Sequence, residues 1–122
     1  MSGIDLRDLT WLRDLEEFEG PILSEYIHRD GTPYLEKWCT NGAGFTRYLL
    51  VSSSKCAIDE YLAGRMSMLD LLTKPSWDSG FLVDYVAGES RQAVRVRVSC
   101  VQQSYLPKPS AMHDKSLRRD PS

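Results

Sequence analysis

Two cysteines and one histidine are the side chains best suited to nucleophilic chemistry in this sequence. The thiol of Cys39 or Cys56 would attack as a thiolate, and the imidazole of His28 would accept its proton. The sequence shows no recognisable oxyanion-hole motif and no acid placed to orient the imidazole. A cysteine and a histidine without such a signature predict an active site poorly. A cysteine-dependent enzyme is therefore the weakest functional hypothesis, and we expect no catalytic residues.

Arginines supply a second kind of chemistry, the binding of anions. Arg91, Arg95 and Arg97 are separated by even numbers of residues, which places them on one face of a strand, and a sheet could bring Arg47 near them. A guanidinium group pairs its donors with a phosphate or a carboxylate, and an aromatic ring such as that of Trp77 stacks on a base. The plainer explanation is a solvated edge strand that its charges protect from aggregation. As the binding residues we expect Arg47, Arg91, Arg95, Arg97 and Trp77.

Metal and phosphate motifs are missing from the sequence. It contains no Cys-x-x-Cys, no His-x-x-x-His and no acidic calcium loop. The short glycine loop at 42–44 precedes an extended run, whereas a phosphate cradle requires a following helix N-terminus. We therefore expect neither a metal nor a cofactor.

A three-stranded antiparallel meander over residues 20–53 is the element expected to position these side chains. Its two turns, at 28–31 and 41–44, contain Asp-Gly and Asn-Gly, which supply the positive φ angles of tight hairpins. The runs between them are rich in aromatic and branched residues, which suit a pleated surface. Residues 11–18 have helix-like spacing but are few, and we favour a first strand that pairs with 22–28 after a short helical turn at 4–10.

After the meander, the spacing of apolar residues changes from that of a strand to that of a helix. Serines at 52–54 offer N-cap oxygens before an apolar stripe that reaches Leu62. Ser67 to Asp70 matches an acidic capping box and opens a second short helix that ends before Pro75. Residues 81–87 and 93–101 predict a closing hairpin, in which alternation should turn Val94, Val96 and Val98 away from Arg95 and Arg97.

The expected fold class is α+β, an antiparallel sheet of about five to six strands with two short helices packed on one face. The length of 122 residues fits one domain, which we place at 1–106, followed by a polar C-terminal tail at 107–122. Trp38 should be largely buried between the sheet and the helix pair.

Four stretches resemble a family of small bacterial domains of unknown function. They are Glu19 to Leu23, Tyr34 to Trp38, Tyr48 to Ser52 and Glu60 to Asp70. Members of this family show an acidic-Gly-Pro-Leu-Leu turn, a Tyr-Leu strand and a Leu-x-x-Gly-x-x-Ser-Leu-x-Asp helical hairpin. The resemblance covers residues 11–85 and implies an α+β domain of a bacterial or phage cytoplasm. It transfers no catalytic residue.

Composition narrows the choice of partners. A net charge of −2 gives no general attraction to nucleic acid or anionic lipid, and no apolar run approaches the length of a membrane span. Three scattered cysteines suit a reducing cytoplasm. The favoured hypothesis is a non-enzymatic interaction module of antitoxin, immunity or defence-associated type that binds a protein partner or itself as an oligomer. The alternative is a protein that binds or sequesters a nucleotide.

Overall fold

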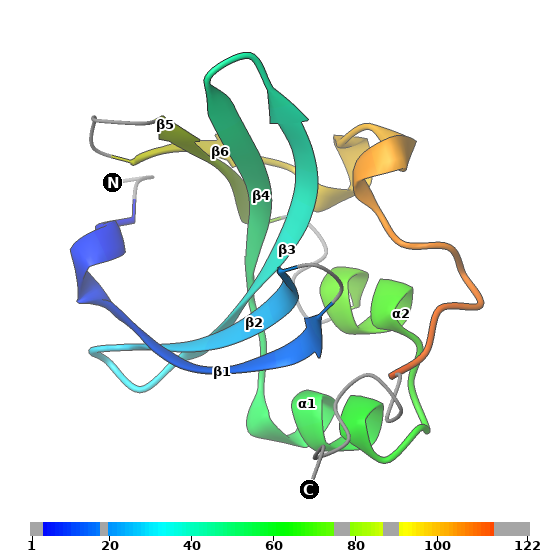
Figure 1. Ribbon diagram of the computed structural model, residues 1–122. Coiled ribbons are helices and arrows are strands. Elements are labelled where there is room, and N and C mark those ends of the chain that lie inside the picture. The colour runs from blue at the N-terminus through cyan, green and yellow to red at the C-terminus, as the bar shows by residue number, and fades with distance from the viewer. Residues whose placement is uncertain (1–3, 18–19, 75–78, 87–90, 114–122) are drawn as a thin grey trace, which may run out of the picture.

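Six strands form one open antiparallel sheet whose strand order follows the chain (Figure 1). The structure is a computed structural model that describes residues 4–17, 20–74, 79–86 and 91–113. Two α-helices lie between the fourth and fifth strands, and a 3-10 turn, η1 (Leu6–Asp8), precedes the first. The strands are β1 (Leu9–Glu17), β2 (Pro21–His28), β3 (Pro33–Gly42), β4 (Phe45–Ser52), β5 (Gly80–Val86) and β6 (Gln92–Val96), and the helices are α1 (Lys55–Leu62) and α2 (Met68–Thr73).

This arrangement confirms the antiparallel sheet and the two helices expected from the sequence. The protein is mostly β, because the helices are few and short. Two hairpins turn where glycine permits a positive φ, at Gly31 (φ +95°) and Gly44 (φ +82°). The second turn is made by Ala43 and Gly44, so that the left-handed residue is Gly44 rather than Gly42.

The sheet is strongly curved, and its two faces have different covers (Figure 1). We call the side that carries α1 and α2 the helix-bearing face and the opposite side the concave face. The main core lies under the helices, where Leu35, Leu49 and Val51 pack against Ile58 and Leu71. Apolar side chains alternate along the strands to reach this core, as the period of two requires.

A smaller core lies on the concave face. Leu50, Phe81 and Val83 are buried there. Residues 4–9, which we call the N-terminal segment, pack over them through Leu6 and Leu9. The sheet is thus covered on one face by helices and on part of the other by the N-terminal segment. This double burial explains why bulky residues occupy both faces of β4.

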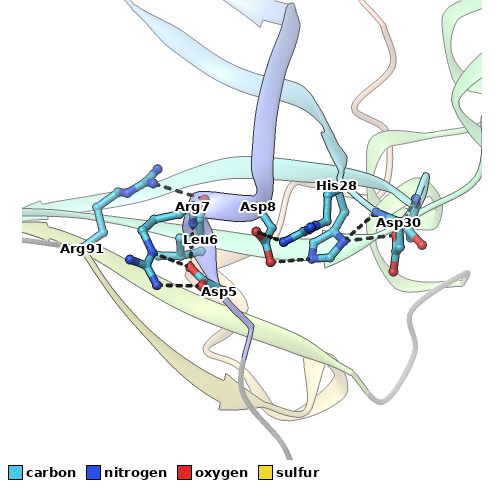
Figure 2. A network of polar contacts seen from close by, with 9 residues as sticks. Asp5, Leu6, Arg7, Asp8, His28, Asp30 and Arg91 are labelled. Carbon is cyan, nitrogen blue, oxygen red and sulfur yellow. Dashed lines mark hydrogen bonds and ion pairs between the residues drawn. The ribbon is translucent and has the colours of Figure 1, made fainter.

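Polar contacts hold the N-terminal segment in place (Figure 2). Asp8 lies 3.5 Å from Arg29 Nη1, and its second oxygen lies 3.9 Å from His28 Nε2. The backbone carbonyl of Asp8 accepts a hydrogen bond from the Arg29 amide, 2.9 Å away. From the far edge of the sheet, Arg91 Nη2 donates to the Leu6 carbonyl at 3.3 Å. The segment therefore links the end of β2 to the region of β6.

The described C-terminal residues run across the helix-bearing face to the helices. The Met68 amide donates to the Ala111 carbonyl at 2.8 Å, and Lys37 Nζ donates to the Tyr105 carbonyl at 3.0 Å. Beyond these contacts, the carboxylate of Glu16 lies 2.5 Å from His113 Nδ1. We call residues 97–113 the C-terminal strap. The division into a domain at 1–106 and a tail at 107–122 stays a prediction.

Two expectations about side-chain placement are wrong. β6 ends at Val96 and passes into a 3-10 turn, Val98–Cys100, so the predicted strand 93–101 is only half as long as expected. Val94 is 62% exposed because β6 is an edge strand that the helices do not reach. Trp38 is half-buried and lies on the concave face, because β3 directs Leu35 and Cys39, rather than Trp38, to the helices.

Neighbouring serines before α1 give a first testable prediction. Ser54 Oγ caps the helix by accepting a hydrogen bond from the Ala57 amide at 3.1 Å, so Ser54→Ala should lower the free energy of unfolding by about 1 kcal/mol. Ser53 Oγ is buried and has no hydrogen-bond partner among the described residues, so Ser53→Ala should be neutral or stabilising. Urea denaturation of both variants checks this, and equal losses would contradict it.

Candidate binding site on the concave face

A buried carboxylate lies at the centre of the concave face. Glu36, in the middle of β3, is 7% exposed. The hydroxyl of Tyr26 donates to one of its oxygens at 3.1 Å, and the hydroxyl of Tyr85 donates to the other at 2.6 Å. The two tyrosines come from β2 and β5, so that the curvature of the sheet brings them together. The carboxylate is therefore held in place by neutral donors from both sides.

The electrostatics of this cluster follow from its burial. Burial raises the pKa of Glu36, and the hydrogen bonds from Tyr85 and Tyr26 lower it in part. The pKa values of Tyr26 and Tyr85 are raised by burial and by the nearby carboxylate of Glu36. The phenol protons thus stay on the tyrosines at neutral pH. The cluster is suited to electrostatic binding rather than to proton transfer.

A second carboxylate lies at the rim. Asp14 Oδ1 accepts hydrogen bonds from Ser24 Oγ at 2.7 Å and from the indole nitrogen of Trp11 at 2.9 Å. Trp11 is 54% exposed, so its ring remains accessible while its nitrogen is bound. The rim of the site therefore combines an acid with an aromatic surface.

Three adjoining hollows open on this face. The first, of about 340 Å³, contains Glu36 and Asp14, and the second, of about 530 Å³, contains Trp38. They share Tyr48, whose ring packs edge-on against Tyr85. A third hollow, of about 490 Å³, shares Tyr85 with the first. We call the three together the aromatic groove. Each hollow by itself has the volume of a small-molecule site.

The groove is acidic. Among the described residues that line its three hollows, Asp14 and Glu36 are the charged ones, and both are acids. Guanidinium groups lie over two of the lining rings, that of Arg91 at 5.5 Å from the Tyr85 centroid and that of Arg47 at 5.2 Å from the Phe45 centroid, but neither arginine lines any of these three hollows. The groove therefore favours a positively charged or neutral occupant over an anion.

The arginines predicted to bind do not converge on one site. Arg91 lies over Tyr85 and Arg95 lies over Phe81, both on the concave side. Arg97 instead follows the end of β6 and lines a hollow of about 380 Å³ with Arg47 and Tyr105. The regular strand that would have aligned Arg95 and Arg97 stops between them.

Arg47 is already paired. It forms two hydrogen bonds with Asp84, at 2.7 and 2.9 Å, and a third with the Tyr105 hydroxyl at 3.2 Å. The Arg47 guanidinium holds the pKa of Asp84 below its usual range. Trp77, the remaining predicted binding residue, lies outside the described residues.

The cysteines and His28 are separate in the structure. Cys39 is buried, and burial raises the pKa of its thiol to about 11. Cys56 and Cys100 are exposed. His28 contacts Asp8 and Asp30 (Figure 2), and no described cysteine lies within hydrogen-bonding distance of a histidine.

Comparison with protein-family models, curated proteins and solved structures finds no match. The family resemblance noted in the sequence thus stays a prediction. Within the described part of the chain, no helix is long and apolar enough to cross a membrane. No group of three or more potential metal ligands gathers there either.

Sequence reasoning missed Glu36 as the centre of a site. The available signal was an acid in the middle of a strand with aromatic residues two positions away on each side. A strand covered on both faces gives such an acid little access to solvent, and a buried carboxylate needs partners. Tyr26 and Tyr85 could not be assigned as those partners without the curvature of the sheet.

Proposed function

We propose that the chain is a non-enzymatic binding module and that the aromatic groove receives its ligand. The observation that carries this proposal is the groove itself, in which aromatic side chains from five strands surround one buried carboxylate. Large apolar walls with a few fixed polar groups are the usual composition of a ligand site. The side chains are held before any ligand arrives, because Glu36 and Asp14 fix the tyrosine and tryptophan donors.

An NMR screen tests this proposal. Chemically diverse soluble compounds, including sugars, nucleotides, carboxylates and amines, would be titrated into the ¹⁵N-labelled protein. We expect at least one class to shift the indole signals of Trp11 and Trp38 in a saturable way, since both rings line the groove. The proposal fails if no compound shifts them, or if every shift clusters around Arg97 on the helix-bearing face.

A matched pair of variants locates the binding face. Tyr48→Ala removes a half-buried ring shared by two hollows and should weaken binding of any groove ligand by about tenfold or more, the scale of a buried aromatic contact. Arg97→Ala changes the hollow on the opposite face and should leave that affinity unchanged. An equal loss in both variants would show that binding does not occur in the groove. Circular dichroism confirms that each variant is folded.

Binding of a protein partner, or of a second copy, is the second candidate. The observation that favours it is the position of three exposed large apolar side chains, Trp11, Leu12 and Val94, on the two edge strands β1 and β6. Edge strands with apolar side chains readily pair with another chain. Light scattering of the protein and of Val94→Lys tests self-association. A monomer at all concentrations would exclude the second copy. The antitoxin, immunity or defence setting stays a prediction.

A further inference from the structure

The carboxylate of Glu36 has no described positive charge in direct contact with it. Its hydrogen-bond partners are two phenol hydroxyls, which are neutral. Arg91 interacts with Glu36 electrostatically from beyond the Tyr85 ring, and its own nitrogens contact the Tyr85 hydroxyl and the Leu6 carbonyl. A buried carboxylate with only neutral donors retains part of its desolvation cost. A cation placed in the adjacent hollow would offset that cost.

The aromatic rings beside Glu36 are also suited to binding a cation. On this sheet, guanidinium groups already lie over the rings of Phe45, Phe81 and Tyr85, at 5.2 to 5.8 Å from the centroids. Within the described part of the chain, no cation lies over Trp11, Trp38 or Tyr48, and these rings line the hollows. Tryptophan and tyrosine faces attract cations through their quadrupoles, and desolvation strengthens the attraction. The open part of the groove thus offers ring faces together with two acids.

The polar groups of the groove indicate which cation fits best. A primary ammonium carries three N–H donors that each need an acceptor. Tyrosine hydroxyls already use two of the about four acceptor sites of the Glu36 carboxylate, and Ser24 and Trp11 both donate to Asp14 Oδ1, so fewer acceptors are left for an ammonium. A methylated ammonium has no donor to satisfy, and it presents an apolar, positively charged surface to the rings.

From this combination we propose that the aromatic groove binds a small organic cation with a quaternary ammonium group, which sits against Glu36 among the rings of Trp11, Tyr48 and Tyr85. The inference rests on the proposed function, since it names the chemical class of the ligand for the same groove. The ring faces supply the attraction, and the two carboxylates select for positive charge.

Choline and 3,3-dimethyl-1-butanol are the probes that isolate the charge. The two molecules share a shape, but the alcohol has a carbon atom in place of the charged nitrogen. Choline should shift the indole signal of Trp11 saturably and bind at least about tenfold more tightly than the alcohol, the scale of a partly desolvated cation–aromatic contact. Equal affinities would overturn the inference and leave the proposed function intact.

Two charge-removing variants complete the test. Glu36→Gln keeps the size of the side chain and should weaken choline binding by about tenfold or more while leaving the affinity for the alcohol unchanged. Glu60→Gln removes a partly exposed acid on α1, which pairs with Arg65, and should change neither affinity. If Glu60→Gln weakens choline binding as much as Glu36→Gln, the attraction is that of the net charge and the inference is wrong. Thermal melting establishes that both variants fold.

The pH dependence of choline affinity tests the role of Glu36 independently. The ionised form of Glu36 binds the cation, and burial raises the pKa of this group, so choline affinity should fall as the pH is lowered through that pKa. The other ionisable groups that face Glu36 are Tyr26, Tyr48, Tyr85, Asp14 and Arg91. Glu36→Gln removes the Glu36 carboxyl, so the difference between the wild-type and variant pH profiles belongs to Glu36. An identical profile in wild type and Glu36→Gln would contradict the role of Glu36.

If neither choline nor the alcohol shifts the indole signal of Trp11, the inference is wrong. If another class of compound in the diverse screen shifts the indole signals of Trp11 and Trp38, the proposed function stands with a different ligand. The absence of any shift in that screen would remove both proposals. The two failures are therefore distinguishable.

Discussion

Replacing Glu16 with alanine is expected to lower the free energy of unfolding by about 3 kcal/mol or more, the scale for removing one member of a buried, charge-assisted cluster. Glu16 is 4% exposed, and its carboxylate binds both the Tyr61 hydroxyl and His113 Nδ1 at 2.5 Å. These partners come from α1 and from the C-terminal strap, whereas Glu16 belongs to β1. The substitution would leave the hydroxyl of fully buried Tyr61 without this acceptor.

Glu17→Ala is the matched control, because Glu17 is the next residue on the same strand and is exposed. It should change the free energy of unfolding by no more than a few tenths of a kcal/mol, roughly the usual effect at exposed positions. His113→Ala should lie between the two, since it removes one partner of Glu16 and leaves the Tyr61 hydroxyl bound. Guanidinium denaturation ranks the three variants. A Glu16→Ala loss as small as that of Glu17→Ala would show that the cluster is not part of the folded core.

Much of the fold follows from local sequence signals. The turns at Gly31 and Gly44, the caps at Ser54 and Ser67 and the alternation along β2 to β4 each act over a few residues. Signals of this kind predicted the meander, both helices and the final hairpin. They also favoured β1 over a helix, and the pairing of Leu9–Glu17 with β2 confirms it.

The placement of side chains was harder to predict from the sequence, because it depends on which strand lies at an edge and on how far a strand continues. The alternation of valine and arginine after Ala93 is that of a long strand, but the chain leaves the sheet after Val96. No residue of the run signals that end. The predicted arginine site depended on the longer strand, and the structure places its members on two faces.

The candidate groove depends on contacts between residues far apart in the chain. Tyr85 is 49 residues from Glu36, and Asp14 and Ser24 meet across β1 and β2. Curvature of the sheet, rather than any motif, brings these side chains together. A single sequence carries little information on curvature, because it arises from twist and bulges summed over several strands. The register shifts in β1 and at Trp38 are such irregularities.

Leu50→Ala is expected to lower the free energy of unfolding by about 2–5 kcal/mol, the range for truncating a fully buried leucine. Leu50 is 0% exposed and forms the floor on which the N-terminal residues Leu6 and Leu9 pack. Leu49 is its neighbour on β4, equally buried, but it points into the core under the helices. Leu49→Ala should therefore cause a loss of similar size with a different local consequence.

Hydrogen exchange distinguishes the two variants. The Arg29 amide donates to the Asp8 carbonyl at 2.9 Å, so its exchange rate reports whether the N-terminal segment remains attached. Leu50→Ala removes the apolar support of that segment and should speed exchange at Arg29 by more than global unfolding explains. In Leu49→Ala, exchange at Arg29 should follow global stability alone. If exchange at Arg29 follows global stability in both variants, the polar contacts of Asp8 and Arg91 hold the N-terminal segment without the small core. Faster exchange in Leu50→Ala would show that burial by Leu50 fixes the N-terminal segment over the concave face, with the polar contacts setting its position.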